Sequence, residues 1–131
     1  MINVSDKDIK RSTQVTPGWQ RIRVDSHYED AAKSDGSKLD KFDLVIVGGD
    51  YDGVPLGFQI SEKAPGFAIP FLKACGAPIG EKGSPLEKGG TVDPKKCVGL
   101  EIECYVKNEL YDGRMLNKPA DFAKLGTNLS K

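Results

Sequence analysis

Cysteine, a residue type that holds many structural metal ions and staples many small secreted domains, is scarce in this sequence. There are only three cysteines, Cys75, Cys97 and Cys104, and no two of them have Cys-x-x-Cys spacing. An odd number without that spacing argues against a zinc site and against the disulfide framework of a secreted protein. Cys104 alternates with apolar residues, which predicts a small hydrophobic side chain facing the core.

Recognisable catalytic motifs are also absent. His27 is the only histidine, and its neighbours Asp25 and Glu29 lie in a polar stretch, so we expect a solvated side chain there. The chain has no serine-histidine-aspartate order, and Gly48-Gly49 lacks the lysine that a phosphate-binding loop needs. We therefore predict a protein that is not an enzyme and that carries no metal and no cofactor.

Neither an excess of one charge nor a long hydrophobic run is present. Lys and Arg together number 19, as do Asp and Glu, which argues against a strong nonspecific binder of polyanions, although a local basic stripe can outweigh net charge. The first fifteen residues contain no apolar signal region, and no later run could span a bilayer. We expect a cytoplasmic protein that does not associate with membranes.

What the sequence does have is many turn residues, 15 glycines and 8 prolines, between short alternating stretches. The alternation of apolar and polar residues predicts five strands, near 19–28, 42–48, 54–61, 97–108 and 113–118. One helix is predicted to end near Gly76, with Pro70 in its first turn. The pairs Asp52-Gly53 and Asp112-Gly113 are typical of hairpin turns.

The order of these elements predicts a mainly β protein with an OB-fold-like, five-stranded, partly open barrel and one short helix between strands 3 and 4. The 131 residues divide into a flexible N-terminal arm (1–16), the OB-like domain (17–122) and a C-terminal tail (123–131). An open antiparallel sheet with a helix on one face is the alternative. An SH3-like barrel would leave the helix unexplained.

Several short motifs carry a resemblance to a known family. They are Pro17-Gly18-Trp19, Leu44-Val45-Ile46-Val47 leading to Tyr51-Asp52-Gly53, Phe71-Leu72-Lys73-Ala74-Cys75-Gly76, Val98-Gly99-Leu100-Glu101-Ile102, and Tyr111-Asp112-Gly113-Arg114 with Asn117. The chain resembles small phage-encoded single-stranded DNA-binding proteins of the OB type, from replication and recombination gene clusters. The resemblance implies sequence-independent binding of single-stranded DNA in the host cytoplasm. It is also compatible with replication or recombination proteins as partners and with a homodimer.

Aromatic and basic residues on strand faces and beside loops are the candidates for such binding, because aromatic rings stack on bases and cations neutralise phosphates. The predicted nucleic-acid-binding residues are Trp19, Arg21, Arg23, Tyr28, Lys38, Tyr51, Tyr105, Lys107, Tyr111 and Arg114. For each tyrosine, surface packing is the structural alternative. For the two strand arginines it is a cross-strand ion pair with Glu101 or Glu103.

A second functional hypothesis comes from another class. The balanced charge favours a phage-encoded adaptor or inhibitor that uses the same barrel to engage a host or replisome protein. The sequence alone leaves both hypotheses open.

Overall fold

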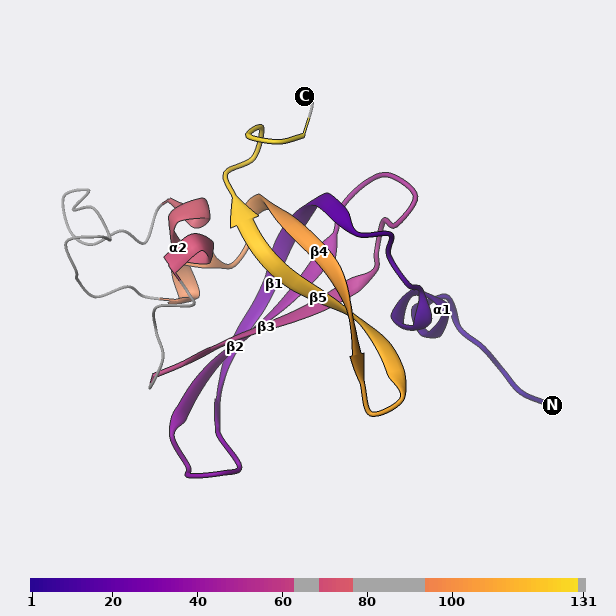
Figure 1. The fold of residues 1–131 in the computed structure, drawn as a ribbon, viewed down its shortest axis with the longest axis horizontal. Helices are drawn as coiled ribbons and strands as arrows, with labels where there is room; N and C mark the ends of the chain where they lie inside the picture. The colour runs from indigo at the N-terminus through magenta and orange to yellow at the C-terminus, as the bar shows by residue number, and fades with distance from the viewer. Residues whose placement is uncertain (63–68, 77–93, 130–131) are drawn as a thin grey trace.

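The structure is a computed structural model and describes residues 1–62, 69–76 and 94–129. The strands within these residues are β1 (Gly18–Ala31), β2 (Lys38–Ile46), β3 (Pro55–Ser61), β4 (Glu101–Tyr111) and β5 (Arg114–Ala123). The helices are α1 (Asp6–Ser12), α2 (Ile69–Cys75) and the short 3-10 helix η4 (Pro94–Cys97). The strands form one antiparallel sheet in the order β3-β2-β1-β4-β5 (Figure 1).

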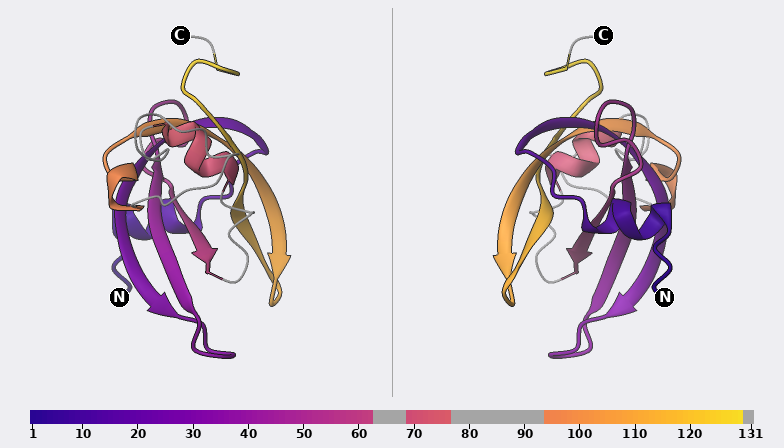
Figure 2. Two further views of the ribbon diagram at one scale, coloured as in Figure 1. Left: turned by 90° about the vertical axis from the view of Figure 1, so that its left-hand side faces the viewer. Right: turned by 90° about the vertical axis from the view of Figure 1, so that its right-hand side faces the viewer.

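The sheet curls strongly but does not close (Figure 2). Its two edge strands, β3 and β5, form no ladder with each other within the described residues. They nevertheless come together through side chains, because the rings of Phe58 and Phe122 pack edge to face with centroids 4.8 Å apart. The five predicted strands and the mainly β class are confirmed, and the shape is consistent with a partly open barrel.

Two hairpins extend from the same side of the barrel (Figure 1). The first hairpin joins β1 to β2 and the last hairpin joins β4 to β5. The turn of the last hairpin is as predicted: Asp112 and Gly113 both have positive φ, +50° and +76°, as a two-residue type I′ turn requires. The other Asp-Gly pair lies in a longer connection between β2 and β3, so the two Tyr-Asp-Gly motifs occupy different kinds of turn.

The first hairpin is longer than the alternation of apolar residues predicts. The pairing of β1 with β2 continues to Ala31 opposite Lys38, through a region expected to be a loop. Two ion pairs hold this polar end together: Lys38 with Glu29 at 3.0 Å and Lys41 with Asp30 at 2.9 Å. Cross-strand charge pairs stabilise a hairpin without any hydrophobic pattern, so the pattern does not detect it.

A β-bulge lies between Val24 and Ser26 and changes the direction of the β1 side chains. Beyond it, His27 points to the inner side, where its ring stacks at 5.1 Å on Phe42 and its Nε2 lies 2.8 Å from an oxygen of Asp40. The expectation of a solvated His27 is wrong, because its side chain is only 3% exposed.

Four phenylalanines fill the open end of the barrel. Phe71, on α2, is fully buried and packs against the rings of Phe42, Phe58 and Phe122 with centroid distances of 4.9 to 5.0 Å. α2 lies inside the curl of the sheet (Figure 2). It follows β3 and precedes β4 along the chain. Gly76 ends it in the left-handed conformation, with φ +69°.

The N-terminal segment, expected to be a flexible arm, contains a second helix. Ser5 and Asp8 form a reciprocal capping box at the start of α1. After the helix, Val15 is fully buried in the core. A polar, mixed-charge stretch gives no hydrophobic periodicity, and the fixing contacts come from β5, about a hundred positions away in the sequence.

The C-terminal tail was expected to fray, but its described residues up to Leu129 are held by hydrogen bonds. Glu103 on β4 is completely buried and its carboxylate accepts hydrogen bonds from the backbone N–H groups of Gly126, Asn128 and Leu129, at 2.7 to 3.1 Å. Burial alone would raise the pKa of Glu103, but these N–H donors outweigh it and hold the pKa below its ordinary value.

Candidate nucleic-acid interface

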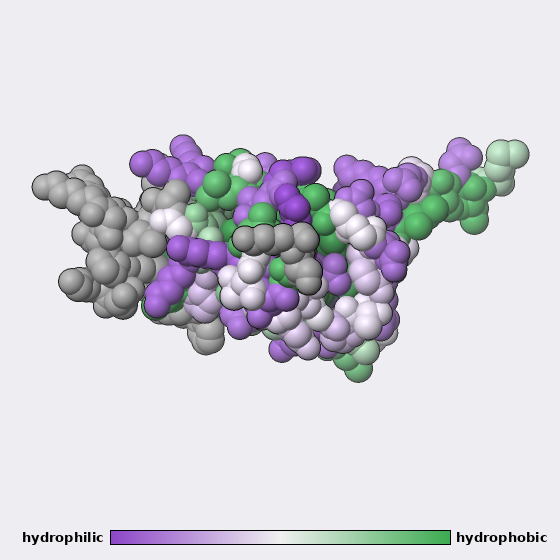
Figure 3. Space-filling view, turned by 90° about the horizontal axis from the view of Figure 1, so that it is seen from above, coloured by the Kyte–Doolittle hydropathy of each residue, from purple (hydrophilic) through white to green (hydrophobic). Residues whose placement is uncertain are grey.

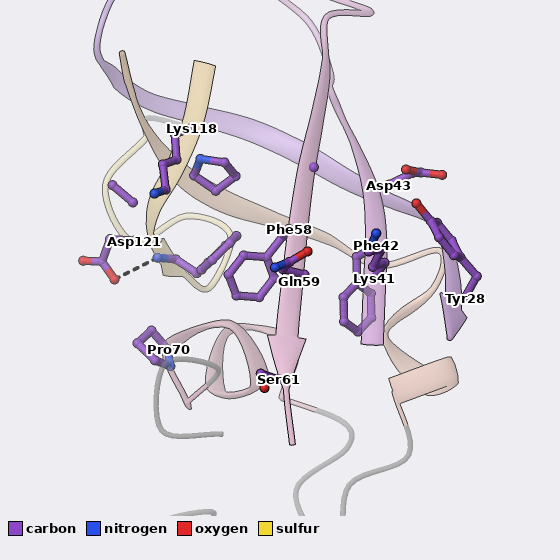
Figure 4. A pocket seen from close by; sticks show the side chains of 14 residues that line it. Tyr28, Lys41, Phe42, Asp43, Phe58, Gln59, Ser61, Pro70, Lys118 and Asp121 are labelled. Carbon is purple, nitrogen blue, oxygen red and sulfur yellow. Dashed lines mark hydrogen bonds between the residues drawn. The ribbon is translucent and has the colours of Figure 1, made fainter. Parts of the chain in front are cut away.

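A groove with a volume of about 610 Å³ lies on the surface of the barrel, between β5 and the strands of the first hairpin. Residues of β1, β2, β3, β5 and α2 line it, and β3 runs through its middle (Figure 4). Its apolar floor is formed by Phe42, Phe58 and Phe122, which belong to the core described above. The groove therefore lies directly over the hydrophobic core.

A cross-strand row of polar side chains forms one wall of the groove. Tyr28 of β1 lies opposite Lys41 of β2, and Lys41 lies opposite Gln59 of β3. Tyr28 is 48% exposed, so a face of its ring is accessible to a ligand. Lys118 and Asp121 of β5 stand on the other side (Figure 4). An aromatic ring, an amide and two ammonium groups thus face one channel.

The charges in the groove are largely compensated. Lys41 pairs with Asp30, and this hydrogen bond raises the pKa of the ammonium above its ordinary value. Lys118 pairs with Glu109 at 3.0 Å, and the side chain of Asp43 accepts a hydrogen bond from Ser26 at 2.8 Å. These exposed pairs are weak, so a phosphate can compete for the ammonium groups at small cost.

Of the ten predicted residues, only Tyr28 lies in this groove. Trp19, Arg21 and Arg23 lie on the first half of β1, away from the groove lining. Trp19 packs edge-on against Tyr105 at 5.6 Å, Arg21 forms an ion pair with Glu101, and Arg23 bonds Asp25 at 2.7 Å. The structural alternative of an Arg–Glu cross-strand pair therefore holds for Arg21, whereas Glu103 is used by the tail.

Tyr51 serves the N-terminal segment. Its hydroxyl accepts a hydrogen bond from the Thr16 backbone N–H at 3.2 Å and shares a second one with Thr16 Oγ1 at 2.7 Å. The bond with the Thr16 side chain is the main reason that the pKa of Tyr51 is lowered. Tyr51 also packs against the core, so surface packing is its observed role.

The remaining predicted residues lie on the two hairpins that flank the groove. Lys38 is in the first hairpin and is paired with Glu29. On the last hairpin, Tyr111 is 64% exposed, Arg114 is exposed, and Lys107 lies 3.8 Å from Glu109. Among the described residues, Arg114 has no ion-pair partner. The predicted set is thus spread over several surfaces, and these four hairpin residues do not line the groove.

No protein-family model matches this chain, and no curated protein matches it either.

Sequence reasoning missed Lys41, Gln59 and Lys118 in the groove. Each occupies an ordinary outward position on a strand, and only the register between strands places them in one channel. Lys41 was in a stretch expected to be a loop. A search for alternating polar positions beside an aromatic residue could have found Tyr28 with Lys41 only if their pairing had been known.

Within residues 1–62, 69–76 and 94–129, no three His, Cys, Asp or Glu side chains gather to hold a metal ion. No helix in those same ranges is long and apolar enough to cross a membrane. The surface seen from above is mostly hydrophilic, with separate apolar areas and an apolar N-terminal end that projects from the body (Figure 3).

Proposed function

We propose that this protein binds single-stranded DNA without sequence preference, along the groove between the two hairpins. The observation that carries the proposal is the cross-strand row Tyr28–Lys41–Gln59, which faces Lys118 across an open channel. Unpaired bases stack on exposed aromatic rings, and lysines contact the phosphates between them.

The last hairpin extends this surface. Tyr111 and Arg114 form its final residue pair, and both are exposed, so a strand leaving the groove can stack on the ring and contact the guanidinium. Stacking on a ring and contact with a phosphate are possible for every base, which supports binding that does not depend on sequence. The resemblance to phage single-stranded DNA-binding proteins adds replication or recombination as the setting.

The test is a titration of labelled oligo-dT with the full chain at two salt concentrations. We expect binding that weakens as salt rises, because phosphate contacts release counterions. Tyr28→Ala should weaken binding about tenfold, which is within the range for one stacked base. Leu125→Ala is the matched control, because Leu125 is 45% exposed and does not line the groove. Equal affinity of wild type and Tyr28→Ala would contradict the assignment of the groove.

A second function, a protein–protein adaptor, is favoured by a different observation. The last hairpin exposes Leu110, Met115 and Leu116 next to Tyr111. Leu110 and Met115 lie directly opposite each other, so they form one apolar surface. An exposed cluster of this kind is typical of a protein-binding site, and it does not depend on the ion-paired lysines of the groove.

One double variant distinguishes DNA binding from the adaptor function. Leu110→Ser with Met115→Ser removes the apolar surface and leaves the groove lining intact, so DNA binding through the groove should remain. A folded wild-type protein that ignores oligo-dT at low salt would overturn the DNA proposal. The adaptor would then be supported by a partner that binds wild type and loses affinity for the double variant.

A further inference from the structure

Two of the three cysteines meet in the core at the junction of two helical elements. Cys75 is the last residue of α2 and Cys97 is the last residue of η4. Neither residue is in a disulfide, and both are buried in the same hydrophobic cluster. The two side chains lie in hydrogen-bond contact with each other. Positions far apart in the sequence thus place two sulfur atoms side by side.

The backbone on both sides of this contact is held in place. Gly76, directly after Cys75, closes the C-terminus of α2 by donating its N–H to the Leu72 carbonyl at 3.1 Å. Shortly after Cys97, Gly99 donates to the Val24 carbonyl at 2.7 Å, and the Val24 N–H donates to Leu100 at 2.9 Å. The backbone next to each thiol is therefore held by hydrogen bonds, which favours one relative position of the two sulfur atoms.

Cys104 provides an internal contrast. It is equally buried, in the middle of β4, but its thiol donates to the carbonyl of Tyr105 at 3.6 Å. Burial raises the pKa of Cys104 to about 12. For Cys75, the hydrogen bond with Cys97 comes first and burial second, and both raise the pKa of its thiol. Both residues are thus stable thiols under reducing conditions, but only Cys75 has a thiol beside it.

We propose that Cys75 and Cys97 are a dithiol modification site that oxidises reversibly to an intramolecular disulfide, linking α2 to the segment that leads into β4. The oxidant we assign is a small-molecule disulfide such as oxidised glutathione. The bond would clamp the helix that carries Phe71 against the barrel, and would close residues 75–97 into a ring.

The exchange balances as follows. Cys75 is the less buried of the two, at 8% exposure against 0% for Cys97, so its sulfur loses its proton to solvent and attacks the oxidised glutathione. One glutathione thiolate leaves and takes up a proton, and a mixed disulfide forms on Cys75. The Cys97 sulfur then loses its proton and attacks the Cys75 sulfur, which releases the second glutathione as a thiol. Two protein thiols are oxidised and one glutathione disulfide is reduced to two thiols.

The test counts thiols on the unmodified full-length protein. The chain is incubated overnight with excess oxidised glutathione, the reagent is removed, and free thiols are measured after denaturation. We expect three free thiols in the reduced protein and one after oxidation. The intact mass should fall by two hydrogen atoms, with no increase in oligomer size.

Peptide mapping then assigns the bond. Trypsin cuts after Lys73 and Lys96 and so separates Cys75 from Cys97, while chymotrypsin cuts after Leu100 and Tyr105 and separates Cys97 from Cys104. We expect one linked pair that contains Cys75 and Cys97. Because the ring is long, the oxidised protein should melt about 10 °C higher than the reduced one. Dithiothreitol should reverse both the link and the shift.

Cys104→Ser is the matched control and should keep the link, whereas Cys75→Ser should lose it. Three thiols that stay free under oxidant would overturn the proposal. So would a link through Cys104, a link between chains, or a glutathione adduct that Cys97 never resolves. These overturning outcomes are all measured on the wild-type protein, so the test remains valid even if a serine variant fails to fold.

Discussion

The two hairpins that flank the groove have the same topology and opposite surface chemistry. The first hairpin ends in ion pairs, Lys38 with Glu29 and Lys41 with Asp30, so its cations are already partnered. The last hairpin ends in exposed Leu110, Tyr111 and Met115, beside Arg114. The first hairpin is thus stabilised by its own charge pairs, whereas Arg114 on the last hairpin has no ion-pair partner among the described residues.

Their attachment to the barrel differs as well. The first hairpin is continuous with the core through Phe42 and the His27–Asp40 contact. The last hairpin is instead anchored by amides: Asn117 accepts from the Val15 N–H at 2.8 Å and donates to the Thr13 carbonyl at 2.7 Å. Asn108, opposite Asn117, donates to the Val15 carbonyl at 2.9 Å. The exposed hairpin thus depends on the N-terminal segment for its support.

The largest expected effect comes from breaking that support. Asn117→Ala removes two bonds to backbone groups and leaves the partly buried Val15 N–H without its acceptor. We expect a loss of about 3 kcal/mol in the free energy of unfolding, measured by urea denaturation. Gln14→Ala is the control, because its 3.4 Å bond to Asn108 is long and exposed. A loss below about 1 kcal/mol for Asn117→Ala would mean that the N-terminal segment is not coupled to the hairpin.

The next largest effect compares the buried carboxylate of Glu103 with the more exposed carboxylate of Glu109 on the same strand. Glu103→Gln should cost about 2 kcal/mol of stability at pH 7, because a charged acceptor of three backbone N–H groups is lost. Glu109→Gln should change stability little, because the Glu109 side chain is 40% exposed and its pKa is lowered mainly by the hydrogen bond with Lys118.

The pH dependence of Glu103 follows from the direction of its shift. Its folded pKa lies below the ordinary value of 4.5, so its contribution to stability is complete above that value and disappears as pH falls through the folded pKa. Urea denaturation from pH 7 down to pH 3 should show wild type losing more stability than Glu103→Gln. Parallel pH curves for the two proteins would contradict this role.

A smaller effect tests the last hairpin as a ligand surface and rests on the proposed DNA binding. Tyr111→Ala should weaken oligo-dT binding by about 1.4 kcal/mol, tenfold in Kd, without changing the salt dependence, since stacking releases no counterions. Its unfolding free energy should stay near that of wild type, because the side chain is exposed. If affinity is unchanged, the ring takes no part in binding.

The smallest effect is on the salt dependence of binding, and it compares Arg114, which has no ion-pair partner among the described residues, with the paired Lys38. Arg114→Ala should flatten the slope of log Kd against log salt by about 0.7, the value for one phosphate contact with a single strand. Lys38→Ala, on the first hairpin, should leave the slope unchanged, because Lys38 is paired with Glu29 and does not line the groove. Equal slope changes in the two variants would remove the distinction between the hairpins.

Parts of this molecule could be predicted because they depend on neighbours in the sequence. Alternation of Leu100, Ile102, Cys104 and Val106 indicated β4, and the Asp112-Gly113 pair indicated the turn that follows. The polar continuation of the first hairpin could not be predicted in the same way. There, the hairpin is stabilised by charged side chains that face each other across two strands. A pattern of hydrophobic residues does not reveal such pairs.

The lining of the groove was predicted least well, for a related reason. Only Tyr28 of the predicted residues lines it, while Trp19, Arg21 and Arg23 are occupied by partners on β1 and β4. The type of a residue indicates what it can bind, but its availability depends on which charges lie beside it after folding. Glu101 was a predicted partner of these arginines, whereas the tail that occupies Glu103 was not foreseen.

By itself, the sequence determined the class of this protein: its alternation and turn residues specify five strands, since side-chain period and φ preference are local properties. Only the tertiary structure decided which strands are neighbours in the curled sheet, and therefore which side chains share a surface. The groove row Tyr28–Lys41–Gln59, the Asn117 support and the Cys75–Cys97 contact all join positions that lie far apart along the chain. Such contacts form because burying the core fixes strand register and curvature, which no short stretch of sequence specifies.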